Sequence, residues 1–356
     1  MLSLKARLSL FLLFSFSFFC VNSFAYQGGV ILLYHHVSDT TPEITSVSSS
    51  QFEAHLNYLE TNNFEVVSTS QILNAARNGI DLPPKAVAIN FDDAYESVYS
   101  TAFPALKVRD WPFSIFVSSD AIDGGYNDYM SWQQLAEVLE YGAEIGGHTA
   151  SHAHLVRSFE DESYDQWLMR VSEEIDKGNR RIEEVLNIEV RLFAYPYGEF
   201  TQEIKTLLSE RNLFGLAQYS GAVSSYTDLL EAPRYPMASS YADIERFALV
   251  AQTKALPVLS VEAGELIRIE GQETGELNLL LDQGDYRLSQ IACYSATGQV
   301  LDINRDEYLL EINLPDFVAG RNKINCTAPS SSESGVYYWF SRQWIVKDAA
   351  GNWLAE

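Results

Sequence analysis

The hydrophobic pattern of the chain changes once, near residue 256, and this change constrains the fold more than any other feature. Before residue 256, short apolar runs alternate with segments of helical periodicity. After it, short runs of alternating polarity are separated by turns that contain glycine. We therefore expect two structural parts, residues 26–255 and residues 256–356, that differ in fold class.

The first part predicts a series of strand–helix units. Strands are expected at residues 30–36, 86–91, 113–117, 143–147, 191–195 and 214–218, and helices at residues 51–62, 96–107, 132–140, 162–187, 201–210 and 241–253. Such units favour a parallel α/β sheet, either rolled into a barrel or open and doubly wound. The longest helix is expected to bury an apolar stripe of Tyr164, Trp167, Leu168, Val171, Ile175, Ile182, Val185 and Leu186.

The second part predicts a small antiparallel β-sandwich. Its strands are expected at residues 258–261, 266–269, 277–281, 308–312, 336–340 and 343–346. The aromatic residues Tyr337, Tyr338, Trp339 and Trp344 fit either a sugar-binding surface or the core of the sandwich, and the core is the favoured interpretation.

Two cysteines, Cys293 and Cys326, lie in this second part, 33 residues apart. They form either a disulfide or a pair of buried free thiols. In an oxidising compartment we expect the disulfide, which the loop-entropy model values at roughly 3 to 4 kcal/mol.

Residues 1–25 have the pattern of a secretory signal. Lys5 and Arg7 precede an apolar stretch that ends at Phe19, and Ser23-Phe24-Ala25 supplies a site with small residues. We expect cleavage after Ala25, with no stable membrane span afterwards and a secreted or periplasmic location. The apolar stretch is short for a membrane span, although a retained anchor is the alternative.

The chain is strongly acidic, with a formal net charge of −24. Cleavage of the leader would remove two cations and no acids and so make the charge −26. This balance argues against nucleic acid as a partner, because phosphate binding needs positive charge. An acidic surface fits a glycan that becomes cationic as its acetyl groups are removed, and it equally fits an exported protein of a saline-water organism.

The chemistry-bearing residues fall in two short segments. Asp92 and Asp93 follow an apolar run, and side chains at adjacent positions of an extended backbone point to opposite sides, so the two carboxylates can have different tasks. His148 and His152 stand four residues apart and would share one face if the segment were helical. Two imidazoles and a carboxylate form a ligand set that Zn²⁺ accepts. The alternative is that these are polar groups of the core with separate partners, which is the less economical interpretation.

A third segment, Phe193-Ala194-Tyr195-Pro196-Tyr197-Gly198, completes a pattern that resembles the polysaccharide deacetylases of carbohydrate esterase family four. The resemblance covers roughly residues 28 to 250. It is closest to the biofilm poly-N-acetylglucosamine deacetylase branch, whose catalytic domain begins with a Tyr-His strand, here Tyr34-His35. The resemblance implies a distorted, incomplete (β/α) barrel.

The resemblance also implies a role for each matching residue. Asp93, His148 and His152 would hold the metal, Asp92 would be the general base, and the backbone N–H of Tyr197 would stabilise the oxyanion. His35 would be the acid that protonates the leaving amine. Tyr195, Pro196 and Trp132 are expected to contact the substrate.

One departure from the common family pattern concerns an arginine that pairs with the catalytic aspartate. This chain has Ala194 at that position, and the nearby Arg191 would lie on the other face of the strand. Arg234, between two prolines in Ala232-Pro233-Arg234-Tyr235-Pro236, is the best replacement.

The implied activity is metal-dependent removal of N-acetyl groups from a β-linked N-acetylglucosamine polymer, with release of acetate. Two alternatives stay open: an O-acetyl or acetyl-xylan esterase with the same machinery, and a catalytically silent glycan-binding protein. A metalloprotease is disfavoured, because the two-histidine segment lacks the glutamate of His-Glu-x-x-His.

Overall fold

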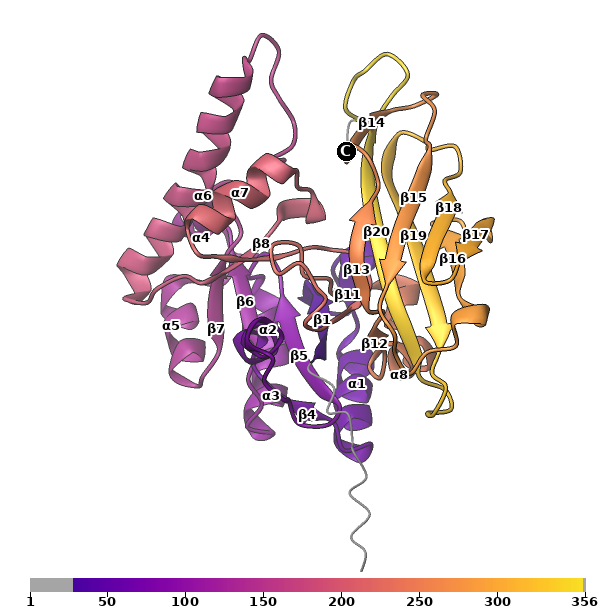
Figure 1. Ribbon diagram of the computed structural model, residues 1–356. Coiled ribbons are helices and arrows are strands. Elements are labelled where there is room, and N and C mark those ends of the chain that lie inside the picture. The colour runs from indigo at the N-terminus through magenta and orange to yellow at the C-terminus, as the bar shows by residue number, and fades with distance from the viewer. Residues whose placement is uncertain (1–27, 355–356) are drawn as a thin grey trace, which may run out of the picture.

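The computed structural model describes residues 28–354, which form an α/β lobe and a β lobe that lie side by side (Figure 1). The expected signal segment, residues 1–25, lies outside the described residues. The boundary at residue 256 stays a prediction, and the strand β12 (Lys254–Ala255) just before it already pairs with the β lobe.

A nine-stranded sheet forms the centre of the α/β lobe. Six parallel strands lie in the order β1 (Gly29–Tyr34), β5 (Ala86–Phe91), β6 (Ser114–Val117), β7 (Glu144–Gly147), β8 (Leu192–Ala194) and β9 (Phe214–Leu216). The short strands β4 (Glu65–Val66), β10 (Ala222–Val223) and β11 (Tyr235–Pro236) pair with β5 or β1. Every residue of β1, β5 and β6 is buried, as expected for parallel strands that are covered on both faces.

The sheet curls, and a short segment bridges its two open edges. The N–H of Ala217 donates to the carbonyl of Ala232 (2.9 Å), and the N–H of Ala232 donates to the carbonyl of Gly215 (2.8 Å). The chain then continues into β11, which pairs with β1. The expected incomplete (β/α) barrel is therefore confirmed over the open doubly wound sheet.

Eight α-helices cover this sheet in the part of the chain that the structure describes. They are α1 (Ser49–Thr61), α2 (Thr69–Asn78), α3 (Phe103–Val108), α4 (Ser119–Asp123), α5 (Trp132–Glu140), α6 (Tyr164–Leu186), α7 (Gln202–Glu210) and α8 (Ile244–Val250). Capping boxes begin α1, α2, α5 and α6, and each pairs a serine with a glutamine three residues later. Helices α2 and α4 were not expected, and the helix expected at 96–107 is a π-helical turn (Val98–Ala102) followed by α3.

The buried stripe of α6 is shorter than expected. Trp167, Val171, Ile175 and Ile182 are buried, whereas Tyr164 is 58% exposed and Val185 is 36% exposed. Tyr164 is the first residue of α6, and the first turns of this helix project beyond the sheet in Figure 1.

The β lobe consists of two sheets. One contains β12, β14 (Ile267–Ile269), β16 (Ala292–Ser295), β19 (Gly320–Pro329) and β20 (Tyr337–Lys347), and the other contains β13 (Val258–Glu262), β15 (Glu276–Leu281), β17 (Ile303–Asp306) and β18 (Leu309–Asn313). One apolar cluster joins them, with Leu279 and Leu310 from one sheet and Trp344 from the other. The expected disulfide is confirmed, because Cys293 of β16 is bonded to Cys326 of β19.

The β lobe differs from the expectation in several details, and the short strands β16 and β17 were not expected. The sheet that contains β20 is mixed, since β12 and β14 pair with β20 in parallel. The two strands expected at 336–340 and 343–346 are the single strand β20. The ten-residue strand β19 was missed, because polar residues alternate through it and its outward side chains contact the other lobe.

The aromatic residues of β20 support the core interpretation. Trp344 is fully buried, and Tyr338 is 8% exposed. Trp339 lies between the lobes, with its ring 5.7 Å from that of Tyr235. These three side chains stabilise the lobe and its contact with the barrel.

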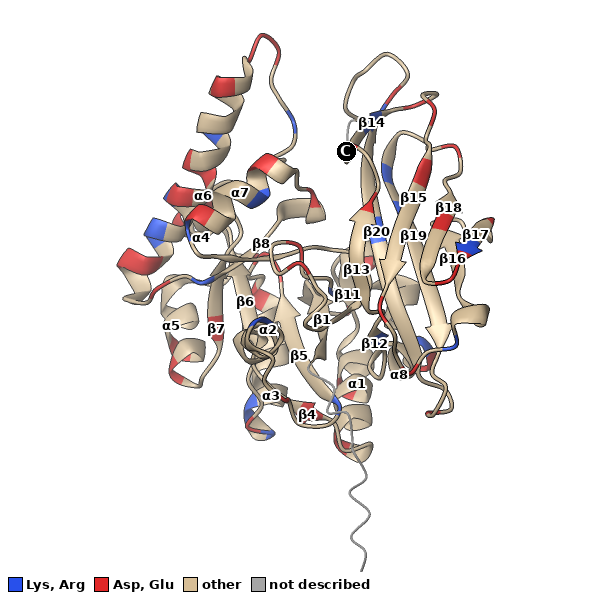
Figure 2. Ribbon diagram, viewed as in Figure 1, with Lys and Arg blue, Asp and Glu red and all other residues tan. Residues whose placement is uncertain are grey.

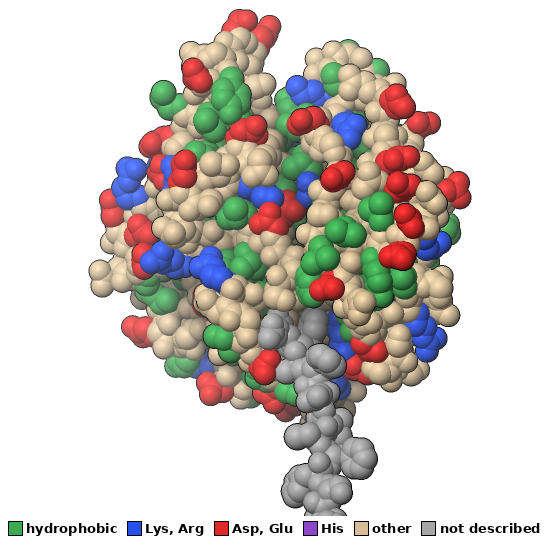
Figure 3. Space-filling view, in the orientation of Figure 1, with side chains coloured by type: hydrophobic (Ala, Val, Ile, Leu, Met, Phe, Trp, Pro, Cys, Tyr) green, Lys and Arg blue, Asp and Glu red, His purple; other side chains and the backbone are tan. Residues whose placement is uncertain are grey.

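Charged side chains are spread over both lobes. Acidic residues lie along α6 and on the strands and loops of the β lobe (Figure 2), and the face in Figure 3 carries both signs in scattered positions. Among residues 28–354, no helix combines the length and the apolar character that crossing a membrane would require.

His55 on α1 is a buried neutral imidazole. It is fully buried, accepts a hydrogen bond from the Tyr34 hydroxyl (3.0 Å), donates to the carbonyl of Ala242 (2.9 Å) and stacks on Phe247 (4.0 Å). Burial lowers the pKa of His55 to about 4. The unfolded chain therefore takes up this proton near pH 6.5, while the folded chain does not.

This difference predicts a specific loss of stability in acid. Stability contributed by neutral His55 is complete above about pH 6.5 and falls as the pH drops toward 4, by about 2 kcal/mol at pH 5. Urea unfolding of the wild type and of His55→Gln at pH 7.5 and pH 5 measures it. The wild type should lose about 2 kcal/mol more than the variant between these pH values, and equal losses would contradict the assignment.

Candidate metal centre and active site

The candidate site lies where the parallel strands end at their carboxyl edge. Asp92 and Asp93 follow β5, His148 follows β7, and Tyr197 belongs to the loop after β8. This edge is where barrels of this kind place functional side chains, because successive loops converge there.

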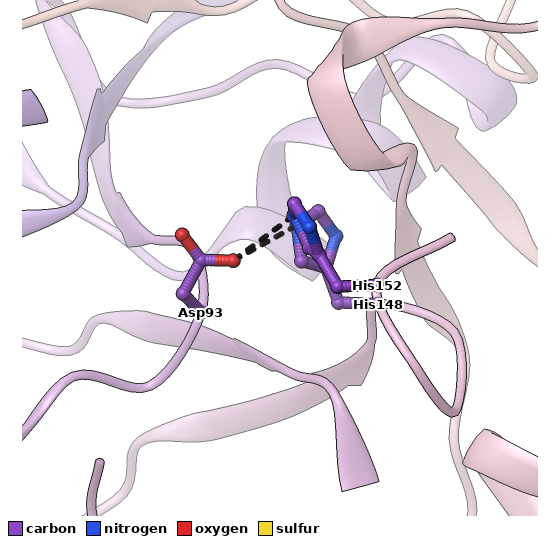
Figure 4. Close-up of side chains that lie close together, drawn as sticks. All are labelled: Asp93, His148 and His152. Carbon is purple, nitrogen blue, oxygen red and sulfur yellow. Dashed lines mark ion pairs between the residues drawn. The ribbon is translucent and has the colours of Figure 1, made fainter. Parts of the chain in front are cut away.

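Asp93, His148 and His152 come together around one point (Figure 4). The Oδ1 atom of Asp93 lies 3.4 Å from Nε2 of His148 and 3.2 Å from Nε2 of His152. One ligand atom from each residue lies within 4.8 Å of the other two. His148 and Asp93 are buried and His152 is partly exposed, so the group is open on one side only. This donor set fits a divalent metal ion such as Zn²⁺.

The far side of each imidazole is held by a second contact. Nδ1 of His148 lies 2.7 Å from the carbonyl oxygen of Ala194, to which it can only donate, and Nδ1 of His152 lies 3.2 Å from the Tyr197 hydroxyl. With the proton on Nδ1 in both rings, each Nε2 keeps its lone pair for a cation.

A strained loop, not a helix, brings the two histidines together. The segment from His148 to His152 has no helical turn, so the explanation from helical spacing is wrong. Instead Thr149 (φ 66°), His152 (φ 59°) and Asp93 (φ 71°) all have left-handed backbones. Such conformations are costly for residues other than glycine and persist where the surrounding structure holds them.

Helix α6 holds this loop. The N–H of Ala150 donates to the carbonyl of Glu174 (2.9 Å). Gly178 allows the close approach, because a Cβ atom there would lie 2.6 Å from the backbone of Thr149. The glycine in the middle of α6 is therefore explained by packing against the site.

The protonation states of Asp93 and His152 favour cation binding. Burial by itself would raise the pKa of Asp93, but its hydrogen bond and charge interaction with His148 outweigh burial and lower the pKa strongly. Burial and the neighbouring His148 lower the pKa of His152 to about 4. The pKa of His148 is raised, because Asp93 and Asp92 outweigh its burial. A cation would replace the proton that the two carboxylates attract to His148.

Asp92 has a different partner. Arg234 binds it through two parallel hydrogen bonds, Nη1 to Oδ1 (2.7 Å) and Nη2 to Oδ2 (2.8 Å). Both side chains are almost completely buried, and Nε of Arg234 donates to the carbonyl of Ala217 (2.9 Å). Burial would raise the pKa of Asp92, but the guanidinium outweighs it, so the pKa is lowered and the carboxylate is ionised.

His35 follows β1 and lies at the same edge. It is close enough to Asp92, Asp93 and His152 for its charge to act on the pKa of each. The neighbouring His36 is buried and stacks on Tyr95, with 3.6 Å between the ring centroids.

A cavity of about 280 Å³ opens beside the metal-ligand group. Its lining contains Asp93, Tyr95, Ser118, Asp120, Ala121, Tyr126, Tyr129, Ser151 and His152. Burial and the neighbouring carboxylate of Asp93 raise the pKa of Tyr95. Sequence reasoning missed the tyrosines of this wall, because nothing in their spacing connects them to Asp93.

His154 and Glu199 form a further pair that was not assigned. Nδ1 of His154 lies 2.8 Å from Oε2 of Glu199, and the His154 ring stacks on Tyr197 at 3.6 Å. The available signals were the third histidine of the cluster and an acidic residue directly after Gly198.

Three residues expected to contact substrate have their side chains engaged elsewhere or buried. Tyr195 is 1% exposed and donates its hydroxyl to the carbonyl of Leu230 (2.6 Å), and Pro196 is buried. Trp132 begins α5 and donates to Asp123 (2.8 Å), and it is not among the residues that line the cavity. Their contact with substrate stays a prediction.

Comparison with known families and proteins agrees with this geometry. Residues 79–214 match the family model described as "Polysaccharide deacetylase". The chain is 25% identical over 211 residues to a poly-beta-1,6-N-acetyl-D-glucosamine N-deacetylase of Escherichia coli (strain K12), which covers 49% of this chain and 31% of that protein. It is 24% identical over 194 residues to the protein of the same name from Staphylococcus aureus (strain MRSA252), which covers 53% of this chain and 67% of that protein.

The fold is shared with solved deacetylase structures. IcaB from Ammonifex degensii aligns with a TM-score of 0.56 and 26% identity, over 63% of this chain and 97% of that chain. The deacetylase PplD of Streptococcus pyogenes aligns with a TM-score of 0.54 and 23% identity, over 60% of this chain and 93% of that chain. The chain spans about a third of the length of the Escherichia coli relative. The resemblance seen in the sequence is confirmed: residues 79–214 match the polysaccharide deacetylase family, and the α/β lobe has the fold of solved deacetylases.

Proposed function

We propose that this protein removes N-acetyl groups from a β-linked N-acetylglucosamine polysaccharide and releases acetate. The main support for the proposal is that two adjacent buried carboxylates have different partners. Asp93 faces two imidazoles, and Asp92 faces a guanidinium. A glycan-binding protein without activity would have no need of both arrangements. The names of the relatives from Escherichia coli and Staphylococcus aureus favour a β-1,6-linked polymer as the substrate.

Asp93, His148 and His152 would hold the metal, which we propose to be Zn²⁺. Imidazole nitrogen and carboxylate oxygen suit this ion, and three protein ligands are typical of catalytic zinc sites. When bound, the ion would polarise the acetamide carbonyl and lower the pKa of water from about 15.7 toward about 7.

Asp92 would accept the proton of the attacking water. Its carboxylate is ionised and held in one orientation by Arg234. Each carboxylate oxygen has more than one acceptor site, so the contact with Arg234 leaves capacity for the proton. Arg234 would act on Asp92 without touching the substrate.

His35 would protonate the leaving amine, and the backbone N–H of Tyr197 would donate to the developing oxyanion. A protonated imidazole can deliver a proton to a poor leaving group. A backbone donor at a fixed position stabilises the negative charge without reorganisation during the reaction.

We also propose that the protein acts outside the cytoplasm. The disulfide between Cys293 and Cys326 fits an oxidising compartment, and a polymeric glycan is an extracellular or periplasmic substrate. The pattern of residues 1–25 agrees with export.

Acetate release from a substrate panel tests the activity. The panel contains β-1,6-linked N-acetylglucosamine polymer, chitin oligomers, peptidoglycan and acetylated xylan, each with and without a chelator. We expect release from an N-acetylglucosamine polymer that stops with chelator and returns with Zn²⁺. Release from xylan alone would indicate an O-acetyl esterase, and no release from any substrate by metal-replete protein would contradict the proposal.

Amide and ester substrates distinguish the role of Asp92 from that of His35, because they differ in the leaving group. Asp92→Asn should lower turnover of amide and ester substrates alike, by about 10²- to 10⁴-fold, because both need the activated water. His35→Ala should lower amide turnover by about 10²-fold or more and ester turnover much less, because an alcohol leaves more easily than an amine. The measurement is kcat on paired amide and ester substrates.

Metal content and circular dichroism are the controls for these variants, since Asp92→Asn leaves the Arg234 charge buried without its partner. Near-normal turnover of folded, metal-replete Asp92→Asn would refute the base. Equal amide and ester losses in His35→Ala would refute the acid.

A further inference from the structure

The β lobe reaches the loops of the candidate site with three side chains. Arg321 donates to the carbonyl of Tyr197 (2.7 Å), Lys323 to the carbonyl of Gln218 (2.8 Å), and Gln343 to the carbonyl of Gly198 (2.9 Å). Tyr197 and Gly198 belong to the loop after β8, and Gln218 follows β9. Each contact therefore binds main chain at the carboxyl edge of the barrel.

These three donors lie on one face of one sheet. Arg321 and Lys323 are two residues apart on β19, so they point to the same side. Gln343 on β20 is paired directly with Lys323, which places it on that side as well. The polar residues that made β19 difficult to predict therefore lie on the face that contacts the barrel.

The loop after β8, which Arg321 and Gln343 bind, has two successive residues in the left-handed conformation. Tyr197 (φ 59°) and Gly198 (φ 70°) are both left-handed. Gly198 has no room for a side chain, because a Cβ atom there would lie 2.5 Å from the Cβ of Gln218. A non-glycine residue in this conformation needs support from its surroundings.

Support comes from both lobes. On the barrel side, the Tyr197 ring stacks on His154 and its hydroxyl contacts Nδ1 of His152. On the other side, Arg321 and Gln343 bind the two successive carbonyls of Tyr197 and Gly198. Fixing these carbonyls fixes the peptide planes on either side of Gly198. The first of these planes also sets the ψ angle of Tyr197, whose N–H belongs to the preceding peptide.

The buried position of Gln343 indicates that its contact is more than a surface coincidence. Gln343 is 3% exposed. Burial and the neighbouring positive charge of Arg321 lower the pKa of Lys323 to about 8. The protonated ammonium therefore loses hydration in this position.

We propose that Arg321 and Gln343 of the β lobe are positioning residues for the Tyr197–Gly198 peptide and that the β lobe is thereby an integral part of the deacetylase site. The inference rests on the proposed function, in which the backbone N–H of Tyr197 faces the oxyanion. Neither residue touches the reacting atoms. Both hold the peptides that follow the donor and so restrict the rotation about the ψ bond of Tyr197 that would let its N–H turn away from the oxyanion.

Steady-state kinetics on an N-acetylglucosamine polymer, with the full chain loaded with Zn²⁺, tests the proposal. Arg321→Ala and Gln343→Met should each lower kcat about tenfold or more, with KM changed by less than about twofold, because the donor matters most in the transition state. Zn²⁺ content and the thermal midpoint should stay close to wild type for Arg321→Ala, since Arg321 is exposed.

Two matched variants separate positioning from general loosening of the lobes. Arg321→Lys should recover most of the activity, because an ammonium can still donate to the Tyr197 carbonyl. Tyr226→Phe should keep wild-type kcat, because the bond that it removes, from the Tyr226 hydroxyl to Asp282 (2.7 Å), joins the lobes without touching the site loops.

The outcomes distinguish the two proposals. If the wild type is active and both Arg321→Ala and Gln343→Met keep its kcat, the positioning role is wrong and the proposed function stands. The positioning role is also wrong if Tyr226→Phe loses as much kcat as Arg321→Ala. A metal-replete wild type that releases no acetate from any glycan overturns the proposed function and the positioning role with it.

Discussion

The site depends on the compensation of two adjacent buried negative charges. Asp92 and Asp93 directly follow β5, and both side chains are buried. A buried charge without a partner costs several kcal/mol, so each carboxylate must have its own counter-charge or hydrogen-bond donors. Asp92 has Arg234, and Asp93 has the two imidazoles that suit a cation. The partner of each carboxylate therefore decides its proposed role, base for Asp92 and metal ligand for Asp93.

Arg234 connects this electrostatic requirement to the fold. It lies in the segment that bridges the open edges of the sheet between β9 and β11, and its main-chain N–H donates to the carbonyl of Tyr219 (3.0 Å). The guanidinium therefore reaches Asp92 from the place where the barrel closes. Closure of the incomplete barrel and the ionised state of Asp92 depend on the same residue.

The sequence predicted the parallel strands and the clustering of Asp93, His148 and His152, because both leave local signals. Apolar runs mark the parallel strands, and Asp92, Asp93, His148 and His152 stand in short segments at strand ends. What it missed depends on contacts between distant segments. The tyrosines around the cavity come from more than one loop, and one face of β19 is polar because its side chains contact the other lobe.

The expected meeting of His148 and His152 has a different structural cause from the one that their spacing suggested. His148 and His152 do meet, but through left-handed backbone at Thr149 and His152, which no helical spacing could indicate. The loop is held by α6, where Gly178 permits the approach. Strain of this kind is typical of functional sites, and it becomes visible only when the backbone is known.

The most direct test of the account is the position of a bound metal. Anomalous diffraction from crystals grown with Zn²⁺ should show one strong peak at about 2.0 to 2.2 Å from an Asp93 oxygen and from Nε2 of both His148 and His152. Asp92 should stay on Arg234 and outside the coordination sphere. Zinc bound elsewhere, or zinc held by Asp92 in place of Asp93, would contradict the division of roles on which the proposed activity rests.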